Sequence, residues 1–512
     1  METIKNLLMG FSVLLTPENM LYSFGGVLIG QIVGILPGLG SVIAIAVLLP
    51  FTYSLDPIPA LVAFCGIYYG SQFGGAISSI LINAPGTESA VMTTVDGYPM
   101  AKKGQAGRAL GTAAISSFTG GMAGSILVVL LAGPLVQMII SFAAPEYLAL
   151  MIFAMACITG MAEKSSQAKS IVAICTGLAL GTIGLDVSFG APRMTFGSLA
   201  LYEGISFIIL AIGVFAMAEV MRNVSNAKHN GLQRIHAMEV VGRVGISLKD
   251  WKLIIPTHIR CTLVGFFIGV LPGVGAATAT PLCYSLEKKI IGEDNAEWGK
   301  GEIRGVAAPE SANNSCAMGA LMPLLTLGVP GSSSAAIMLT AFMILGIQPG
   351  PLLFQNHPDI LWALLASFFI GNVMLLVINL PLVRYCVKLV QVPTELLFMS
   401  VWILAIVGSY AVGLRVFDVG MICILSVLGV VYGICKIPLA PMLVAILLGD
   451  MIEYYLAATI VLCRRSFVNF MSRPIVLLFL VLAVLVIVLP MLRDRFKKNK
   501  VQSAVDIIDA PE

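Results

Sequence analysis

Three polar stretches interrupt the apolar sequence between residues 265 and 336: Gly269-Val-Leu-Pro272-Gly273-Val-Gly275, Ala308-Pro-Glu310-Ser-Ala-Asn313-Asn314-Ser315 and Val329-Pro330-Gly331-Ser332-Ser333-Ser334. Comparable stretches occur earlier, between residues 30 and 90: Gly34-Ile-Leu-Pro37-Gly38-Leu-Gly40, Tyr68-Tyr69-Gly70-Ser71-Gln72 and Ala84-Pro85-Gly86-Thr87-Glu88-Ser89. Proline removes a backbone donor and clashes with the preceding turn, so each Pro-Gly pair must break or kink a helix. The chain is therefore predicted to contain two sets of broken helices.

The composition identifies the environment of these helices. Of the 512 residues, 58% are hydrophobic and 11% are charged, and the mean hydropathy is +0.96. Soluble proteins carry about a quarter charged residues, so the chain is predicted to be an all-α polytopic membrane protein in contact with lipid. The net charge of +3 is small and implies no nucleic acid. The four histidines are isolated and show no metal-ligand spacing, and no cofactor is predicted.

The apolar runs predict about ten to twelve transmembrane helices, since one crossing needs about 20 apolar residues. Matched motifs, such as Pro37 with Pro272 and Pro85 with Pro330, recur at offsets of 235 and 245 and indicate an internal repeat. The predicted organisation is a first membrane repeat at 1–220, a polar linker at 221–251, a second repeat at 252–492, and a basic then acidic cytoplasmic tail at 493–512.

Basic residues predict that the two repeats are inverted. Residues 100–108 carry three Lys or Arg and the corresponding residues 346–359 carry none, whereas residues 51–57 carry none and the corresponding residues 287–304 carry four. Positively charged loops are retained on the cytoplasmic side. Because the Lys and Arg residues lie in opposite members of the paired loops, the two repeats are expected to have opposite orientations. The linker and residues 287–304 are both basic, which suggests that the segment around Pro272 enters the membrane and returns as a hairpin.

Paired interrupted segments are the best sequence indication of a transporter's binding site. Helix starts after Pro85 and Pro330 would offer backbone N–H groups to an anion, although their hydroxyl residues could equally be ordinary helix caps. Asn313 and Asn314 could instead form helix-to-helix hydrogen bonds. The predicted substrate-binding residues are Gly38, Gly40, Pro85, Gly86, Thr87, Ser89, Gly273, Gly275, Asn313, Asn314, Pro330, Gly331, Ser332 and Ser334.

Two further expectations concern single residues of the second repeat. Glu310 is the candidate site for a coupling Na⁺ or H⁺, because ionisable groups at membrane depth are costly, although it could also lie at the membrane surface. A large side chain at Gly331 is expected to fill the space where the backbone meets the anion. No catalytic residue is predicted.

Several long motifs together resemble one family, the large membrane subunit (TctA) of tripartite tricarboxylate transporters. They are Gly34-Ile-Leu-Pro-Gly-Leu-Gly40, Gly66-Ile-Tyr-Tyr-Gly70, Asp96-Gly-Tyr-Pro-Met-Ala-Lys102, Gly305-Val-Ala-Ala-Pro-Glu310-Ser-Ala-Asn-Asn314 and Gln348-Pro-Gly-Pro-Leu-Leu-Phe354. The resemblance covers nearly the whole chain. It implies a multi-pass protein of the bacterial inner membrane that works with a small four-span membrane subunit and a periplasmic solute-binding protein.

The resemblance further implies secondary, ion-coupled uptake (symport) of carboxylates such as citrate. The alternative functions are a stand-alone carboxylate permease or exporter and, from another class, an intramembrane enzyme. An enzyme would need a nucleophile with a base, a carboxylate pair or a metal cluster, and the sequence shows none of these. The sequence separates the two transporter alternatives only through the family resemblance.

Overall fold

The computed structural model describes residues 2–36, 39–52, 55–139, 142–160, 167–186, 190–222, 244–292, 295–381, 383, 385 and 394–488. Almost all of this is helical, with one antiparallel pair of two-residue strands. Within these ranges six helices are long and apolar enough to cross a membrane: Pro57–Ile82, Ala106–Leu135, Leu248–Val270, Pro358–Asn379, Val416–Ile434 and Pro441–Leu462. This confirms the prediction of an all-α polytopic membrane protein. The total of ten to twelve crossings stays a prediction.

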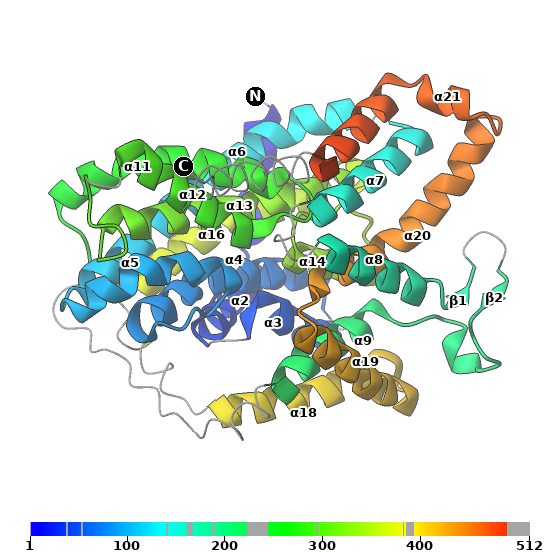
Figure 1. Ribbon diagram of the computed structural model, residues 1–512, viewed down its shortest axis with the longest axis horizontal. Helices are drawn as coiled ribbons and strands as arrows, with labels where there is room; N and C mark the ends of the chain where they lie inside the picture. The colour runs from blue at the N-terminus through cyan, green and yellow to red at the C-terminus, as the bar shows by residue number, and fades with distance from the viewer. Residues whose placement is uncertain are drawn as a thin grey trace, which may run out of the picture. The chain divides into compact units, whose positions relative to one another are not determined.

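Two compact units make up the chain, and the larger consists of residues 1–141 and 205–435. Its elements are α1 (Glu2–Leu14), α2 (Pro17–Ile35), α3 (Gly40–Leu48), η1 (Leu49–Thr52), α4 (Pro57–Ile82), η2 (Glu88–Ala90), α5 (Val91–Lys102), α6 (Ala106–Ile139), α9 (Phe207–Ala211), η4 (Ile212–Met217), α11 (Leu248–Val270), α12 (Gly275–Ile291), α13 (Ile303–Leu327), α14 (Ser333–Ile344), α15 (Pro351–Asn356), α16 (Pro358–Asn379), α18 (Thr394–Gly413) and α19 (Val416–Ile434). Most of them are drawn in Figure 1.

The smaller unit consists of residues 142–204 and 436–512. Its elements are α7 (Ala144–Gly160), α8 (Gln167–Gly181), β1 (Gly184–Leu185), β2 (Pro192–Arg193), η3 (Leu199–Leu201), α20 (Leu439–Leu462) and α21 (Phe467–Met471). Helix α20 packs along α7 and α8. Two ion pairs also join distant parts of this unit, because Arg193 binds Glu453 at 2.9 Å and Arg473 binds Glu146 at 2.7 Å.

These units divide the chain differently from the predicted repeats, since each unit contains segments of both halves. Much of the predicted linker (223–243) and the predicted tail (493–512) lie outside the described residues. Helix α11 begins at Leu248, so the last residues of the predicted linker already belong to a helix. Ser247 caps this helix by accepting a hydrogen bond from the N–H of Asp250, while the Asp250 carboxylate accepts one from the N–H of Ser247.

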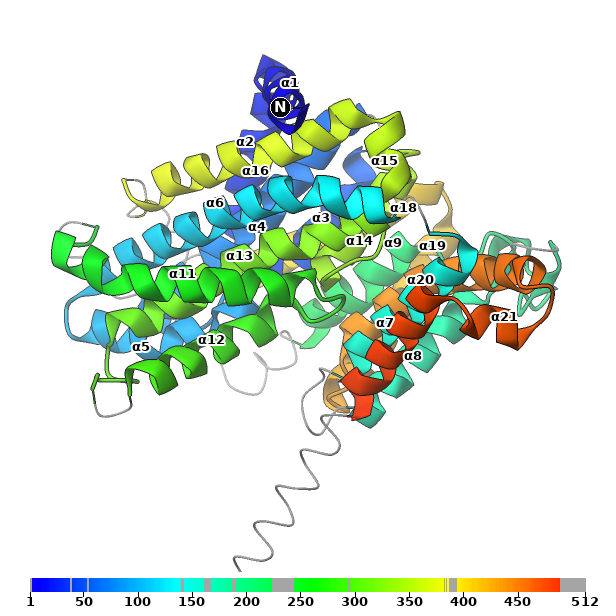
Figure 2. The same cartoon turned by 90° about the horizontal axis from the view of Figure 1, so that it is seen from above.

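Glycines let α2 pack directly along α4, and the same contacts recur between α11 and α13 (Figures 1 and 2). A Cβ built on Gly30 would overlap the backbone of Ile67, and one built on Gly265 would overlap the backbone of Ala312. Gly34 and Gly269 repeat this one turn further on, against Ser71 and Cys316. The first helix of each pair is offset by 265 − 30 = 235 residues and the second by 312 − 67 = 245 residues. The packing therefore repeats in register.

The second half contains the predicted hairpin around Pro272. Helices α11 and α12 lie side by side and run in opposite directions, with residues 271–274 between them. Arg260 of α11 donates to the buried Glu287 carboxylate of α12 at 2.6 Å, and Thr257 donates to the same carboxylate at 2.8 Å. Closer to the turn, Cys283 approaches the carbonyl oxygen of Cys261. The corresponding Pro37 lies outside the described residues.

The two packed pairs run in opposite directions. Gly97 of α5 contacts Ile80 of α4, and its neighbour Asp96 contacts Gly305 of α13. Further along, Asn313 of α13 meets the backbone of Gln72 on α4. Later residues of α13 therefore lie beside earlier residues of α4, so these two helices are antiparallel. Inversion relative to a membrane stays a prediction.

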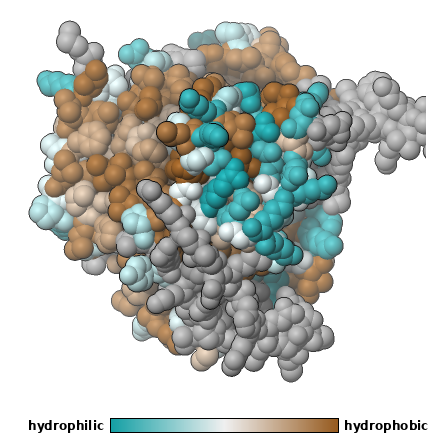
Figure 3. Space-filling model, turned by 90° about the vertical axis from the view of Figure 1, so that its left-hand side faces the viewer, coloured by the Kyte–Doolittle hydropathy of each residue, from teal (hydrophilic) through white to brown (hydrophobic). Residues whose placement is uncertain are grey.

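The basic loops of the two halves lie together at one end of the larger unit. Lys103 pairs with Glu297 at 3.1 Å, and the Asp96 carboxylate accepts hydrogen bonds from the N–H groups of Gly301 and Glu302. We call this the basic-loop end. Figure 3 looks onto this side, where hydrophilic side chains gather beside hydrophobic ones. Towards the far end of α13, the N–H of Gly350 donates to the carbonyl oxygen of Leu325, which lies about 33 Å along the helix from Ile303.

This arrangement predicts the outcome of labelling single cysteines in a cysteine-free variant. We expect Lys103→Cys and Gln355→Cys, both at exposed positions, to react with a membrane-impermeant thiol reagent from opposite sides of the membrane. Glu297→Cys is the matched control, because Glu297 contacts Lys103 and must label from the same side as Lys103→Cys. Labelling of positions 103 and 355 from one side would remove the inverted-repeat interpretation.

Candidate substrate and ion site

In each half, the Pro-Gly loop at Gly86 or Gly331 passes the broken helix of the same half so closely that their backbones are in contact. In the second half, the N–H of Gly273 donates to the carbonyl oxygen of Gly331 at 3.1 Å. A Cβ on Gly331 would lie 2.7 Å from the carbonyl oxygen of Ala320 and 3.0 Å from that of Gly269. In the first half, a Cβ on Gly86 would overlap the carbonyl oxygen of Gly34. Glycine is required at both crossings because no side chain fits there.

The two halves exchange contacts at these loops. Helix α14 packs against α3, and η2 packs against α12, so the helix start of each half meets the broken helix of the other. The Ser41 and Ser334 hydroxyls lie 2.7 Å apart and are buried, and the Tyr68 and Ser332 hydroxyls lie 3.3 Å apart. These are hydrogen bonds between halves, and we call these four residues the hydroxyl cluster.

A second group of polar side chains lies beside the first-half loop. Ser89 donates to the Gln72 side-chain oxygen at 2.9 Å, and Thr87 lies 3.1 Å from the Ser89 hydroxyl. Asn313 reaches the backbone carbonyl of Gln72 at 3.4 Å. The Oδ1 atoms of Asn313 and Asn314 are buried without a hydrogen-bond partner. A buried acceptor without a donor costs free energy, which makes these two atoms candidates for contact with a ligand.

The two predicted helix starts differ in their local structure. Ser332 is the N-cap of the 12-residue helix α14, and its hydroxyl accepts a hydrogen bond from the N–H of Ala335 at 3.2 Å. The N–H groups of Ser333 and Ser334 lie in the first turn and so have no partner within the helix. Thr87 makes no cap, because its hydroxyl bonds Ser89 instead. The N–H donors are therefore best arranged at α14.

Glu310 lies in the middle of the helix bundle, fully buried. Its carboxylate accepts hydrogen bonds from Thr93 of α5 at 2.5 Å and from Ser117 of α6 at 2.7 Å. Among the described residues no cationic side chain forms an ion pair with it. Glu310 is therefore enclosed by protein, and its depth relative to the membrane stays a prediction. Its charge is balanced only by hydroxyl donors, and no group of three or more His, Cys, Asp or Glu in the described ranges could hold a metal ion.

The sequence interpretation missed five residues that complete these groups: Ser41, Tyr68, Gln72, Thr93 and Ser117. Tyr68 and Gln72 lie one helical turn apart within a stretch that already stood out, so their spacing was a usable signal. Ser41 directly follows Gly40, the first residue of α3 with φ +54°. Nothing in the local sequence of Thr93 or Ser117 indicates that either contacts Glu310.

Most of the remaining predicted residues lie at the turns around the breaks, and their role in binding stays a prediction. Gly275 begins α12 with φ +65° and Gly273 has φ +77°, values that favour glycine at the turn. Pro85 and Pro330 precede the two crossing glycines, and Gly38 lies outside the described residues. The space expected beside Gly331 for an anion is occupied by the backbone of Ala320 and Gly269, so a large residue there would disturb packing first.

Broken helices from two similarly packed halves, meeting at buried hydroxyl groups, define a polytopic membrane protein with the architecture of a transporter. The sequence profile of the tripartite tricarboxylate transporter TctA family matches residues 20–444. The chain therefore belongs to the TctA family and is a subunit of a tricarboxylate transporter.

Two similar proteins come from Agrobacterium vitis. The chain is 39% identical over 502 residues to an uncharacterized 52.8 kDa protein in the TAR-I ttuC' 3' region, covering 98% of this chain and 99% of that protein. It is 37% identical over 238 residues to an uncharacterized protein in the TAR-II ttuC' 3' region, covering 46% of this chain and 98% of that protein. No solved structure matches the chain.

The crossing glycines give a prediction about folding. We expect Gly86→Ala and Gly331→Ala to lower the stability of the purified protein by about 1–3 kcal/mol, the usual effect of forcing an extra group into a packed interior. Gly25→Ala is the matched control, because a Cβ there meets nothing within 4 Å. Thermal unfolding in detergent, followed by size-exclusion chromatography, measures the difference. Equal melting of all three variants would contradict the packing described here.

Proposed function

We propose that this chain is the membrane permease subunit of a secondary transporter that imports tricarboxylates or related carboxylates across the bacterial inner membrane. In this proposal a periplasmic solute-binding protein delivers the substrate, a small four-span membrane subunit completes the complex, and a cation gradient drives uptake. The observation that carries the proposal is the hydroxyl cluster, in which side chains of both halves meet beside the start of α14.

This cluster suits a carboxylate substrate without needing a cationic side chain. A carboxylate leaving water requires fixed donors, and the first N–H groups of α14 offer them at the positive end of a helix dipole. The hydroxyls of Tyr68, Ser332 and Ser334 can add donors, and the unpartnered Oδ1 atom of Asn313 can accept from a hydroxyl or protonated carboxyl group of the substrate.

The same contacts suggest how access alternates. Ser41 bonds Ser334 and Tyr68 bonds Ser332, so the halves satisfy each other's hydroxyls. A bound carboxylate would replace both hydrogen bonds by stronger, charge-assisted ones. The hydroxyls of the cluster would then bond the substrate and no longer the opposite half. That change lets two inverted halves rock about a fixed site.

Glu310 is the proposed coupling residue for H⁺ or Na⁺. A carboxylate without an ion-pair partner at this depth is costly and marks ion or proton pathways in membrane proteins. Glu310 lies one turn before Asn313 on α13, and Thr93 ties it to the segment that follows Ser89. Binding of the cation and binding of the substrate therefore act on the same two elements.

We predict that Ser334→Ala and Tyr68→Phe each weaken substrate binding. A hydrogen bond to a charged group is worth about 1.5–3 kcal/mol, so the substrate concentration for half-maximal uptake should rise about ten- to a hundredfold. Uptake of labelled substrate by cells expressing all three components measures this. Ser426→Ala is the control, since Ser426 is also buried but bonds only within its own helix α19. Unchanged uptake in both test variants would place the substrate elsewhere.

A second prediction concerns coupling. We expect Glu310→Gln to abolish gradient-driven accumulation while exchange of preloaded substrate continues, because the amide keeps the shape and loses the charge. Proteoliposomes with and without an imposed ion gradient measure the two activities separately. Glu297→Gln, at an exposed position, should accumulate substrate normally. Normal accumulation by Glu310→Gln would make Glu310 a structural residue.

The dependence on a binding protein separates this proposal from a stand-alone permease or exporter. We predict that proteoliposomes containing this chain and the small subunit take up substrate at low concentration only when the solute-binding protein is added. The physical reason is that hydroxyl and N–H donors alone bind a hydrated anion weakly, so a high local supply is needed. Equal uptake without the binding protein would favour the stand-alone permease.

A further inference from the structure

The Asp96 carboxylate joins the two halves at the basic-loop end. One of its oxygens accepts hydrogen bonds from the N–H groups of Gly301 and Glu302, each at 2.9 Å, and the other accepts one from the Tyr284 hydroxyl at 2.8 Å. Asp96 belongs to α5 of the first half, whereas all three donors belong to the second half. The residue is fully buried, so these donors take the place of the water that an exposed carboxylate would bind.

The second half fits closely around this carboxylate. A Cβ built on Gly305, in the first turn of α13, would overlap the Asp96 oxygen that Tyr284 bonds, so only glycine leaves room for it. The carboxylate also lies at the start of α13, where the helix dipole favours negative charge. Asp96 is thus held in a fitted slot by charge-assisted hydrogen bonds, which break together if α5 moves away.

Asp96 closes one end of a seam between the halves. On one side of the seam lie η2 and α5, and on the other side lies α12, which packs against both. At the inner end, Ser89 of η2 bonds Gln72, one turn after Tyr68 of the hydroxyl cluster. The seam therefore leads from the proposed substrate site to the basic-loop end, and the Asp96 slot is its outer end.

Helix α12 has two features that suit opening along this seam. Thr280 lies one turn before Tyr284 on the same face of the helix, and its Oγ1 is buried without a hydrogen-bond partner. An unpaired hydroxyl is costly while the seam is closed and finds a partner once water enters. Pro281 follows inside the helix and leaves a backbone carbonyl one turn earlier without its N–H donor, which weakens α12 at this point.

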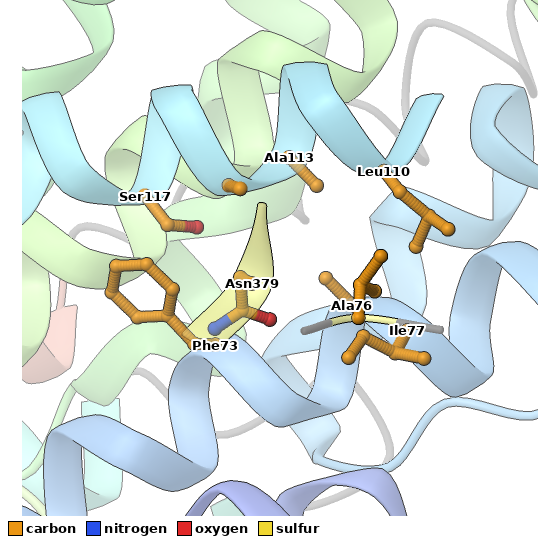
Figure 4. A pocket seen from close by; sticks show the side chains of 9 residues that line it. Phe73, Ala76, Ile77, Leu110, Ala113, Ser117 and Asn379 are labelled. Carbon is orange, nitrogen blue, oxygen red and sulfur yellow. The ribbon is translucent and has the colours of Figure 1, made fainter. Parts of the chain in front are cut away.

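The neighbouring contact between α4, α6 and the end of α16 is packed too tightly to serve as a route. The cavity there has a volume of about 10 Å³, and apolar side chains such as Phe73, Ala76 and Leu110 line most of it (Figure 4). A cavity of this size holds at most one water molecule. A Cβ on Gly120 of α6 would overlap the backbone of Ser311 of α13, so these two helices touch directly. These contacts favour the seam between α5 and α12.

We propose that Asp96 is the latch of a gate at the basic-loop end, and that separation of η2 and α5 from α12 opens the route by which the substrate is released. The inference rests on the proposed function and adds to it the release route, on the side that the basic loops predict to be cytoplasmic. Opening breaks three hydrogen bonds at one residue, and water that enters the seam replaces them.

The same segment connects the latch with the ion site. Thr93, one turn before Asp96 on α5, donates a hydrogen bond to Glu310, and Ser89 bonds Gln72 near the hydroxyl cluster. A cation at Glu310 and a substrate beside Gln72 therefore both act on the segment that carries the latch. Release is in this way tied to the occupancy of both sites.

The test measures whether weakening the latch exposes the seam. Thr280→Cys, in a cysteine-free variant that retains uptake, places a thiol behind the latch and removes no hydrogen bond, because the Thr280 hydroxyl has no partner. Its rate of reaction with a membrane-impermeant thiol reagent is measured in inside-out membrane vesicles, in which the basic-loop side faces the reagent. Thr326→Cys, also buried but near the far end of α13, is the matched reporter that the latch does not cover.

Three substitutions weaken the latch by different means. Tyr284→Phe removes one donor, Asp96→Asn removes the charge, and Gly305→Ala displaces the carboxylate without removing a hydrogen-bonding group. We expect each to raise the labelling rate of Thr280→Cys by about tenfold, equivalent to about 1.4 kcal/mol in favour of the open form, and to leave that of Thr326→Cys unchanged.

Glu297→Gln, which removes an exposed ion pair at the same end, should change neither rate. Tyr284→Phe retains the ring and its packing, so it keeps the test decisive if the other two variants do not fold. An unchanged rate at position 280, or an equal rise at positions 280 and 326, would overturn the latch and leave Asp96 as an ordinary helix cap. Labelling needs no substrate, so this outcome is distinct from failure of the proposed function, which unchanged uptake in Ser334→Ala and Tyr68→Phe would show.

Discussion

The structure depends on satisfying the backbone groups that broken helices leave unpaired inside a membrane. No lipid can bond those N–H and C=O groups, so a break is tolerated only where protein or enclosed water supplies partners. Here the partner is another break, since the N–H of Gly273 bonds the carbonyl of Gly331. Other backbone atoms pack as closely: the carbonyl oxygens of Ala320 and Gly269 exclude a side chain at Gly331, and in the first half the carbonyl oxygen of Gly34 excludes one at Gly86.

The same constraint explains why the hydroxyl cluster forms between halves. Each Pro-Gly loop contacts the broken helix of its own half, and the helical segment that follows it contacts the other half. Helix α14 then meets α3, and η2 meets α12. Ser41 and Ser334 are buried at those meeting points, and their hydroxyls bond each other across the interface. The polar centre of the bundle thus results from the way in which the two broken helices pack against each other's halves.

The sequence predicted the features that depend on local chemistry and repetition. The α11–α12 hairpin around Pro272 followed from proline and loop charge, and the packing register of α2 with α4 and α11 with α13 agrees with the offsets of 235 and 245. It could not predict contacts between distant positions. Thr93 and Ser117 contact Glu310 from 217 and 193 residues away. The local sequence around a lone Thr or Ser in an apolar helix does not indicate which distant residue it contacts. Nor could it show that the space beside Gly331 is filled by backbone of two other helices, at Ala320 and Gly269.

Substrate and ion are linked, in the proposed mechanism, through a short segment of chain. Residues 87–93 carry Ser89, which bonds Gln72 beside the polar centre, and Thr93, which bonds Glu310. Helix α13 carries Glu310 and Asn313 one turn apart, and Asn313 also contacts Gln72, so α13 takes part in both contacts. In this mechanism a change in the charge of Glu310 would alter its hydrogen bond to Thr93 and so act on the segment that carries Ser89. Linkage requires the converse, so in the proposed mechanism substrate bound beside Asn313 would alter the affinity of Glu310 for the cation by the same free energy.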